Sequence, residues 1–152
     1  MKMKAYHFGY QGHKPEDLLL AVEALGAVLC DIRYAPYSRQ PGWSKKALVA
    51  MFGAAYRHIP ELGNLNYKGE YGAGIRIADL DGGLETVFKI LERRPVVVMC
   101  VCREFETCHR LTVAEALQEL GVYADGLDLT MHATIAETRV LNQQLGLFRN
   151  EK

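Results

Sequence analysis

The stretch that decides the fold is residues 95–121, PVVVMCVCREFETCHRLTVAEALQELG. Its first seven residues, Pro95–Val101, are apolar without interruption, which is typical of a β-strand buried on both faces. A polar segment follows, and a helix begins at Thr107 or Cys108 and ends at Gly121. The apolar residues of this helix recur at helical spacing, at Leu111, Ala114, Leu117 and Leu120. The stretch therefore predicts a strand, a loop and an amphipathic helix in that order.

Strands and helices alternate in the same way on both sides of this stretch. The other predicted elements are a strand at 5–8, a helix from Pro15, a strand at 27–32, a helix from Ser44 to about Tyr56, a helix lined by Leu84 and Leu91, a short strand near 122–124 and a helix over about 133–146. The alternation predicts an α/β fold: a single three-layer, Rossmann-like domain over residues 1–152 with a mainly parallel central sheet.

Composition and charge narrow the classes of function. The chain has 152 residues, of which 49% are hydrophobic and 24% charged, as in ordinary globular proteins. Its 18 basic and 18 acidic residues balance, which argues against a nucleic-acid coat or a polybasic membrane binder. The longest apolar run, residues 96–102, is far shorter than a membrane span. Four cysteines are too few for a secreted disulfide scaffold, so we expect a cytoplasmic chain with reduced thiols and no membrane partner.

The segment Arg33–Lys46 is locally basic although the whole chain is neutral. It contains four cations and no acid, with Tyr34, Tyr37 and Trp43 interleaved. Guanidinium groups bind phosphate or carboxylate, and aromatic faces stack on bases or sugars. In a parallel sheet, ligands bind at the carboxyl ends of the strands, where this segment begins. The pattern fits a small-ligand site, a nucleic-acid surface or a solvated loop.

Residues 60–78 follow neither a helical nor a strand period. A loop of this length in a compact domain is usually functional or mobile, and we expect a lid. No segment matches a dinucleotide-binding fingerprint or a P-loop, so no cofactor is predicted.

The segment from Cys100 to Arg110 carries the most reactive side chains. At a helix start, Cys108 would be affected by the helix dipole and by the neighbouring Arg110, both of which lower the pKa of a thiol. The alternatives are a buried, inert thiol and a metal site. The metal-ligand set would be Cys100, Cys102, Cys108 and His109. Adjacent Cys108 and His109 would point in different directions if both were helical, which disfavours the metal site.

Four segments occur together in a family order. They are FGYQG at residues 8–12, DIRYAPYSRQPGWSK at 31–45, PELGN at 60–64 and CHR at 108–110. In these segments the chain resembles the bacterial family known as domain of unknown function 488. The resemblance implies a compact α/β domain with the four segments gathered at one site, and it implies no established reaction. Cys102 and Phe105 stand where the family pattern has an acid and a proline.

These observations lead to one site hypothesis. We expect a small anionic ligand, phosphate-like or nucleotide-like, at the carboxyl ends of the strands, with Cys108 and His109 as catalytic residues. The expected ligand-binding residues are Tyr10, Asp31, Arg33, Ser38, Arg39, Asn64 and Arg110. In the alternative arrangement, Asp31 and Glu61 pair with the arginines in a closed network that only fixes loops. The alternative functions are a nucleic-acid-binding module and a redox or metal protein built on Cys100, Cys102 and Cys108.

Overall fold

The computed structural model describes residues 3–70, 72, 74–102, 105 and 108–129. Its centre is a five-stranded parallel sheet in the order β3-β2-β4-β1-β5. The strands are β1 (Ala5–Gly9), β2 (Val28–Asp31), β3 (Tyr56–His58), β4 (Val96–Cys100) and β5 (Ala124–Gly126). The helices are α1 (Pro15–Leu25), α2 (Lys45–Phe52), α3 (Leu80–Leu91) and α4 (His109–Glu119). The predicted α/β architecture with a parallel central sheet is confirmed.

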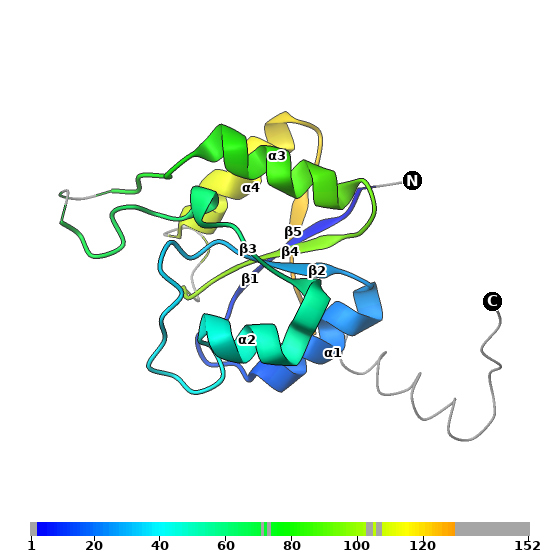
Figure 1. Cartoon of the computed structure of the whole chain (residues 1–152). Helices are drawn as coiled ribbons and strands as arrows, with labels where there is room; N and C mark the ends of the chain where they lie inside the picture. Colours follow the sequence, from blue (N-terminus) through cyan, green and yellow to red (C-terminus); the bar gives the residue numbers. More distant parts are fainter. Residues whose placement is uncertain (1–2, 71, 73, 103–104, 106–107, 130–152) are drawn as a thin grey trace, which may run out of the picture.

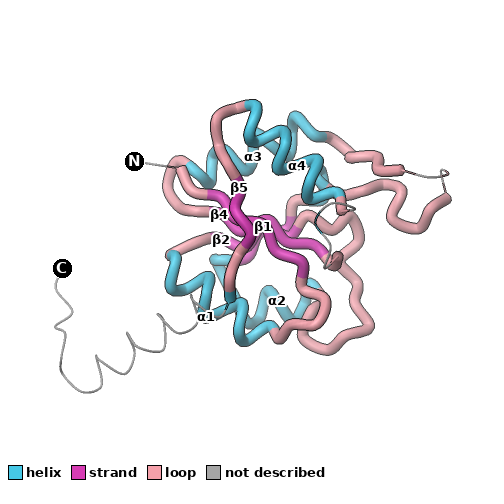
Figure 2. Tube along the Cα trace, turned by 180° about the vertical axis from the view of Figure 1, so that it is seen from behind, coloured by secondary structure: helices cyan, strands magenta, loops and turns pink. Residues whose placement is uncertain are grey.

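Two helices cover each face of the sheet. Figures 1 and 2 show α1 and α2 on one face and α3 and α4 on the other. Each face has its own hydrophobic cluster, and β4 contributes to both in strict alternation. Val96, Val98 and Cys100 pack toward α3 and α4, whereas Val97 and Met99 pack toward α1 and α2. Burial on both faces explains why the apolar run of β4 has no polar interruption.

The predicted C-terminal end of one helix is wrong. The helix predicted from Ser44 through about Tyr56 ends at Phe52, and Tyr56 begins β3. Ser44 caps it as expected, because the Ser44 hydroxyl accepts the Ala47 N–H at 3.2 Å. Gly53 ends it with a φ of 55°, a conformation that glycine adopts without strain. The three residues of β3 are too few to show a strand period in the sequence.

The loops that follow β2 and β4 lie at one edge of the sheet, on the left in Figure 1. The predicted loop over residues 60–78 begins with a 3-10 turn, η2 (Pro60–Leu62), and a single antiparallel bridge joins Asn64 to Ile77. The helix predicted over about 133–146 lies outside the described residues.

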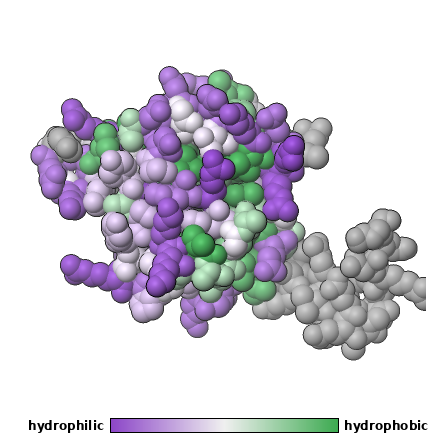
Figure 3. Space-filling view, viewed as in Figure 1, coloured by the Kyte–Doolittle hydropathy of each residue, from purple (hydrophilic) through white to green (hydrophobic). Residues whose placement is uncertain are grey.

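The outer surface is mainly polar on the face shown in Figure 3, where hydrophobic side chains form small, separate patches. No helix in the described part of the chain is long and apolar enough to cross a membrane.

Candidate functional site

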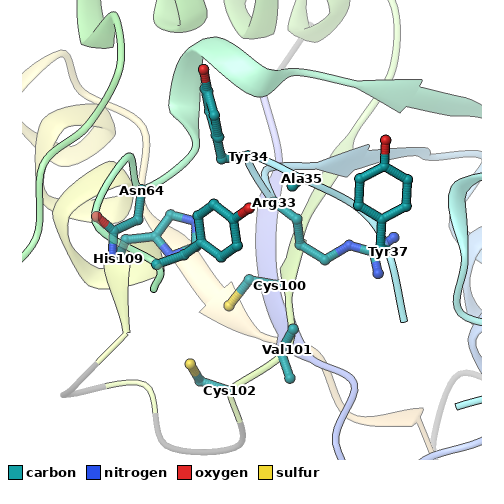
Figure 4. Close-up of a pocket in the computed structure, with 10 residues that line it drawn as sticks. Arg33, Tyr34, Ala35, Tyr37, Asn64, Cys100, Val101, Cys102 and His109 are labelled. Carbon is teal, nitrogen blue, oxygen red and sulfur yellow. The ribbon is translucent and has the colours of Figure 1, made fainter. Parts of the chain in front are cut away.

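A cavity of about 310 Å³ lies at the carboxyl ends of β2 and β4. Figure 4 shows the residues around it, which come from the ends of both strands, the loops after them, the long loop that contains Asn64 and the start of α4. The lining residues are Arg33, Tyr34, Ala35, Tyr37, Asn64, Tyr67, Cys100, Val101, Cys102 and His109. This is the edge where ligands bind in parallel α/β sheets.

A buried ion pair between Asp31 and Arg33 lies at the carboxyl end of β2. Asp31 and Arg33 are 0% and 5% exposed, and two hydrogen bonds join their side chains, Nε to Oδ1 at 2.8 Å and Nη2 to Oδ2 at 2.6 Å. The Tyr56 hydroxyl donates to the same carboxylate at 2.6 Å. Burial lowers the pKa of Arg33, but the hydrogen bonds and charge of Asp31, together with Tyr10, outweigh burial and raise the pKa. Burial, with the charge of Asp31, raises the pKa of Tyr56.

Arg33 is therefore largely committed to protein partners. Its remaining terminal nitrogen donates to the Trp43 carbonyl at 2.7 Å and to the Tyr10 hydroxyl at 3.3 Å. Asp31 and Arg33 therefore form the closed network that the sequence analysis gave as the alternative arrangement. Glu61 is exposed, and no ion pair joins it to an arginine within the described residues.

The other predicted ligand-binding residues are dispersed. Ser38 accepts hydrogen bonds from the Tyr10 hydroxyl at 3.4 Å and the Gln40 N–H at 3.1 Å, and Arg39 is exposed. Asn64 does line the cavity, and its side-chain oxygen accepts the N–H groups of Asn66 and Arg76, each at 2.9 Å. Of the seven residues predicted to hold an anion, the cavity brings together only Arg33 and Asn64.

Arg110 lies beneath this edge and does not line the cavity. It is 2% exposed and donates to the Cys102 carbonyl at 2.7 Å. A second nitrogen contacts Nδ1 of His7 at 3.1 Å. Arg110 thus ties the segment after β4 to β1. Gly9 makes this approach feasible, because a Cβ there would lie 1.6 Å from the Cys102 carbonyl oxygen.

Three thiols form a cluster beside the cavity, which we call the sulfur cluster: Cys100, Cys102 and Cys108. Their Sγ atoms all lie within 4.8 Å of one another. Cys108 is the N-cap of α4, with φ −104° and ψ 150°, and its sulfur accepts the Arg110 N–H at 3.5 Å. Nδ1 of His109 lies 3.8 Å from the Cys108 sulfur, and Nε2 lies 2.9 Å from the Ile32 carbonyl oxygen.

Within the sulfur cluster, deprotonation is most favourable at Cys108. A hydrogen bond from Cys100 outweighs burial and, with hydrogen bonds from His109 and Arg110, lowers the pKa of Cys108 to about 3. Burial raises the pKa of Cys100, so this thiol stays protonated as a donor. Burial lowers the pKa of His109, but its hydrogen bonds to Cys108 and Ile32, together with the charges of Cys108 and Cys102, outweigh burial and raise the pKa. The arrangement favours a thiolate at Cys108 beside an imidazole that binds a proton more readily than usual.

Access to the cluster differs among its members. Cys100 and Cys108 are 1% and 2% exposed, whereas Cys102 is partly exposed. Cys102 also lines the cavity, and Cys108 does not. A hydrogen bond from Cys100 lowers the pKa of Cys102 as well. The thiol that a ligand in the cavity can reach is thus Cys102, which the sequence analysis named only in the alternative of a redox or metal protein.

Three tyrosines at the cavity were absent from the predicted site. Tyr34, Tyr37 and Tyr67 are 42%, 88% and 52% exposed, and the rings of Tyr34 and Tyr67 lie 6.2 Å apart. The sequence signals for Tyr34 and Tyr37 were their place in the basic, aromatic segment and in the family segment at 31–45. Tyr67 had no signal beyond its place in the long loop, because only folding brings that loop beside β2 and β4.

Comparisons with known proteins place the chain in one family. Searches of curated proteins and of solved structures gave no match. A family model, described as "Domain of unknown function DUF488", matches residues 20–117, well over half of the 152 residues. The matched region includes both strands that border the cavity and the whole sulfur cluster. The chain therefore belongs to the family of domain of unknown function 488.

Proposed function

We propose that this chain binds a small anionic ligand in the cavity at the ends of β2 and β4, and that the Cys102 thiol is the group that reacts with it. The supporting observation is that the cavity and the sulfur cluster share a wall: Cys100, Cys102 and His109 line the cavity. A ligand there would meet a thiol whose pKa is lowered by its neighbours.

The charges of the lining favour an anion over a cation. Among the lining residues, Arg33 and His109 are basic and none is acidic. Asp31 balances the charge of Arg33 at 2.6 Å, whereas His109 lies beside the sulfur cluster, with Nδ1 3.8 Å from the Cys108 sulfur. An anionic ligand with an electrophilic carbon could therefore be attracted by His109 and attacked by sulfur.

The size of the cavity favours a small molecule. A volume of about 310 Å³ is at the lower end of the range of small-molecule sites. The nucleic-acid alternative has less support, because Arg33 of the basic segment is buried in its ion pair.

Haloacetates test the proposal, because iodoacetate and iodoacetamide differ in charge at nearly equal size. In each case a sulfur–carbon bond forms as iodide leaves. In the folded chain, we expect Cys102 to react at least about tenfold faster than Cys30, which is 0% exposed and whose pKa burial raises to about 12. The ratio of iodoacetate rate to iodoacetamide rate at Cys102 should exceed that of the urea-unfolded chain. Peptide mass spectrometry after timed labelling gives both results.

The matched variant is His109→Gln, which keeps a side-chain N–H for the Ile32 carbonyl but has no positive charge. It should reduce the preference for iodoacetate while the circular dichroism spectrum stays unchanged. Equal labelling of Cys30 and Cys102, or a rate ratio that unfolding does not change, would refute the proposal.

A further inference from the structure

The sulfur cluster has a feature that nucleophilic chemistry does not require. Attack on a ligand needs one accessible thiol, yet the Sγ atoms of Cys100, Cys102 and Cys108 all lie within 4.8 Å of one another. Figure 4 shows the sulfur atoms of Cys100 and Cys102 on the same side of the chain. Three sulfur ligands and an imidazole form a common ligand set for zinc.

His109 is oriented as a metal ligand would be. Its Nε2 lies 2.9 Å from the Ile32 carbonyl oxygen, which can only accept, so Nε2 carries the hydrogen. In the neutral ring, the lone pair is then on Nδ1, which lies 3.8 Å from the Cys108 sulfur. Metal-binding histidines usually donate their other ring N–H to a carbonyl or carboxylate in this way.

The local backbone removes the sequence argument against a metal. That argument assumed that Cys108 and His109 are both helical and therefore diverge. Cys108 instead has the extended backbone of an N-cap, while His109 is the first residue of α4. With this change of backbone between the two residues, Nδ1 of His109 lies 3.8 Å from the Cys108 sulfur.

We propose that Cys100, Cys102, Cys108 and His109 form a binding site for a thiophilic metal ion, with Zn²⁺ as the ion that fits best. Zinc bonds of about 2.3 Å to sulfur and about 2.0 Å to nitrogen place neighbouring ligand atoms a little under 4 Å apart. The separation of 3.8 Å between the Cys108 sulfur and Nδ1 of His109 already meets this spacing, and the sulfur atoms would have to approach one another by at most about 1 Å. Binding would release the remaining thiol protons to solvent.

Arg110 would balance the charge of the loaded site. Three thiolates, a neutral imidazole and Zn²⁺ carry a net charge of about −1. Arg110 is 2% exposed, its backbone N–H donates to the Cys108 sulfur, and its side chain donates to the Cys102 carbonyl. Its Nε has no hydrogen-bond partner among the described residues. A buried guanidinium beside the site stabilises a negative metal–thiolate group.

This inference rests on the sulfur cluster that the proposed function uses, and it assigns a regulation to it. Sulfur lone pairs bound to a metal are not free to attack carbon. The metal-free chain would therefore be the reactive form, and metal uptake would suppress the thiol chemistry.

Cobalt replaces zinc as a visible probe, because Co²⁺ bound by thiolates absorbs strongly. The full chain, reduced and freed of metal with a chelator that is then removed, is titrated with Co²⁺. We expect sulfur-to-cobalt charge-transfer absorption and the intense d–d bands of a tetrahedral site, saturating at about one equivalent and displaced by Zn²⁺. Cys30→Ser should behave as the unaltered chain. Cys102→Ser should lose part of the charge-transfer intensity and bind at least about tenfold more weakly.

The outcomes separate the two proposals. Absence of charge-transfer bands, or equal titrations of Cys30→Ser and Cys102→Ser, would overturn the metal site. If Co²⁺ does not bind but iodoacetate still labels Cys102 selectively, the metal inference fails alone. If Co²⁺ binds as expected and labelling is unselective in the metal-free chain, the proposed function fails alone.

Discussion

Asp31→Ala is expected to lower the free energy of unfolding by about 3–5 kcal/mol, because it leaves the buried Arg33 guanidinium without its counter-charge. The Asp31 carboxylate is 0% exposed and accepts from Arg33 and from the Tyr56 hydroxyl. Its removal therefore leaves a cation and a hydroxyl unsatisfied at the junction of β2 and β3. Urea unfolding followed by circular dichroism measures the change.

The chain contains a matched control for this prediction. Glu85 and Lys89 form an ion pair at 3.3 Å on the surface of α3, with both side chains more than 70% exposed. Glu85→Ala should change the free energy of unfolding by no more than about 0.5 kcal/mol. If Asp31→Ala cost no more than Glu85→Ala, the buried network would not hold this edge together.

Val98→Asp is expected to cost about 4 kcal/mol or more in the free energy of unfolding. Val98 is 2% exposed in β4, the central strand, where it lies opposite His7 of β1 and Cys30 of β2. A carboxylate there would be buried in the apolar cluster between the sheet and the layer of α3 and α4. The melting temperature and the yield of folded protein report the effect.

The control is Val49→Asp in α2, where the side chain is 48% exposed. It should cost less than about 1 kcal/mol, mainly through the lower helix propensity of aspartate. A Val98→Asp chain that melted at the temperature of Val49→Asp would contradict the two-faced burial of β4.

The order of the main elements could be predicted because buried strands and helices have characteristic patterns of apolar residues. β4 reads Val-Val-Val-Met-Cys since both of its faces are covered, and α3 carries its buried residues Leu84, Val87 and Leu91 at helical spacing. β3 could not be predicted, because its three residues Tyr-Arg-His are held by pairing with β2 and carry no apolar pattern.

The site could be placed at the correct edge, but its internal pairing could not be predicted. Sequence position brings Arg33 and Arg110 to the ends of neighbouring strands, yet their partners depend on side-chain directions that only packing fixes. Arg33 bends back to Asp31, two residues earlier, and Arg110 reaches Cys102 and His7. The contacts of Cys108 could not be predicted for the same reason, because its extended N-cap backbone turns the side chain toward Cys100 and Cys102.

The central claim is that the cavity is the route by which a small ligand reaches the sulfur cluster, and Ala35→Trp tests it most directly. Ala35 lines the cavity, and no hydrogen bond of its side chain is lost by the change. The matched control is Ala54→Trp, at an exposed position in the turn η1 (Gly53–Ala55).

The measurement is the rate at which iodoacetate labels Cys102 in the two variants and in the unaltered chain. Filling the cavity should slow labelling by about tenfold or more in Ala35→Trp, whereas Ala54→Trp should keep the original rate. Equal rates in all three chains, with unchanged circular dichroism spectra, would contradict the claim that the cavity leads to the cluster.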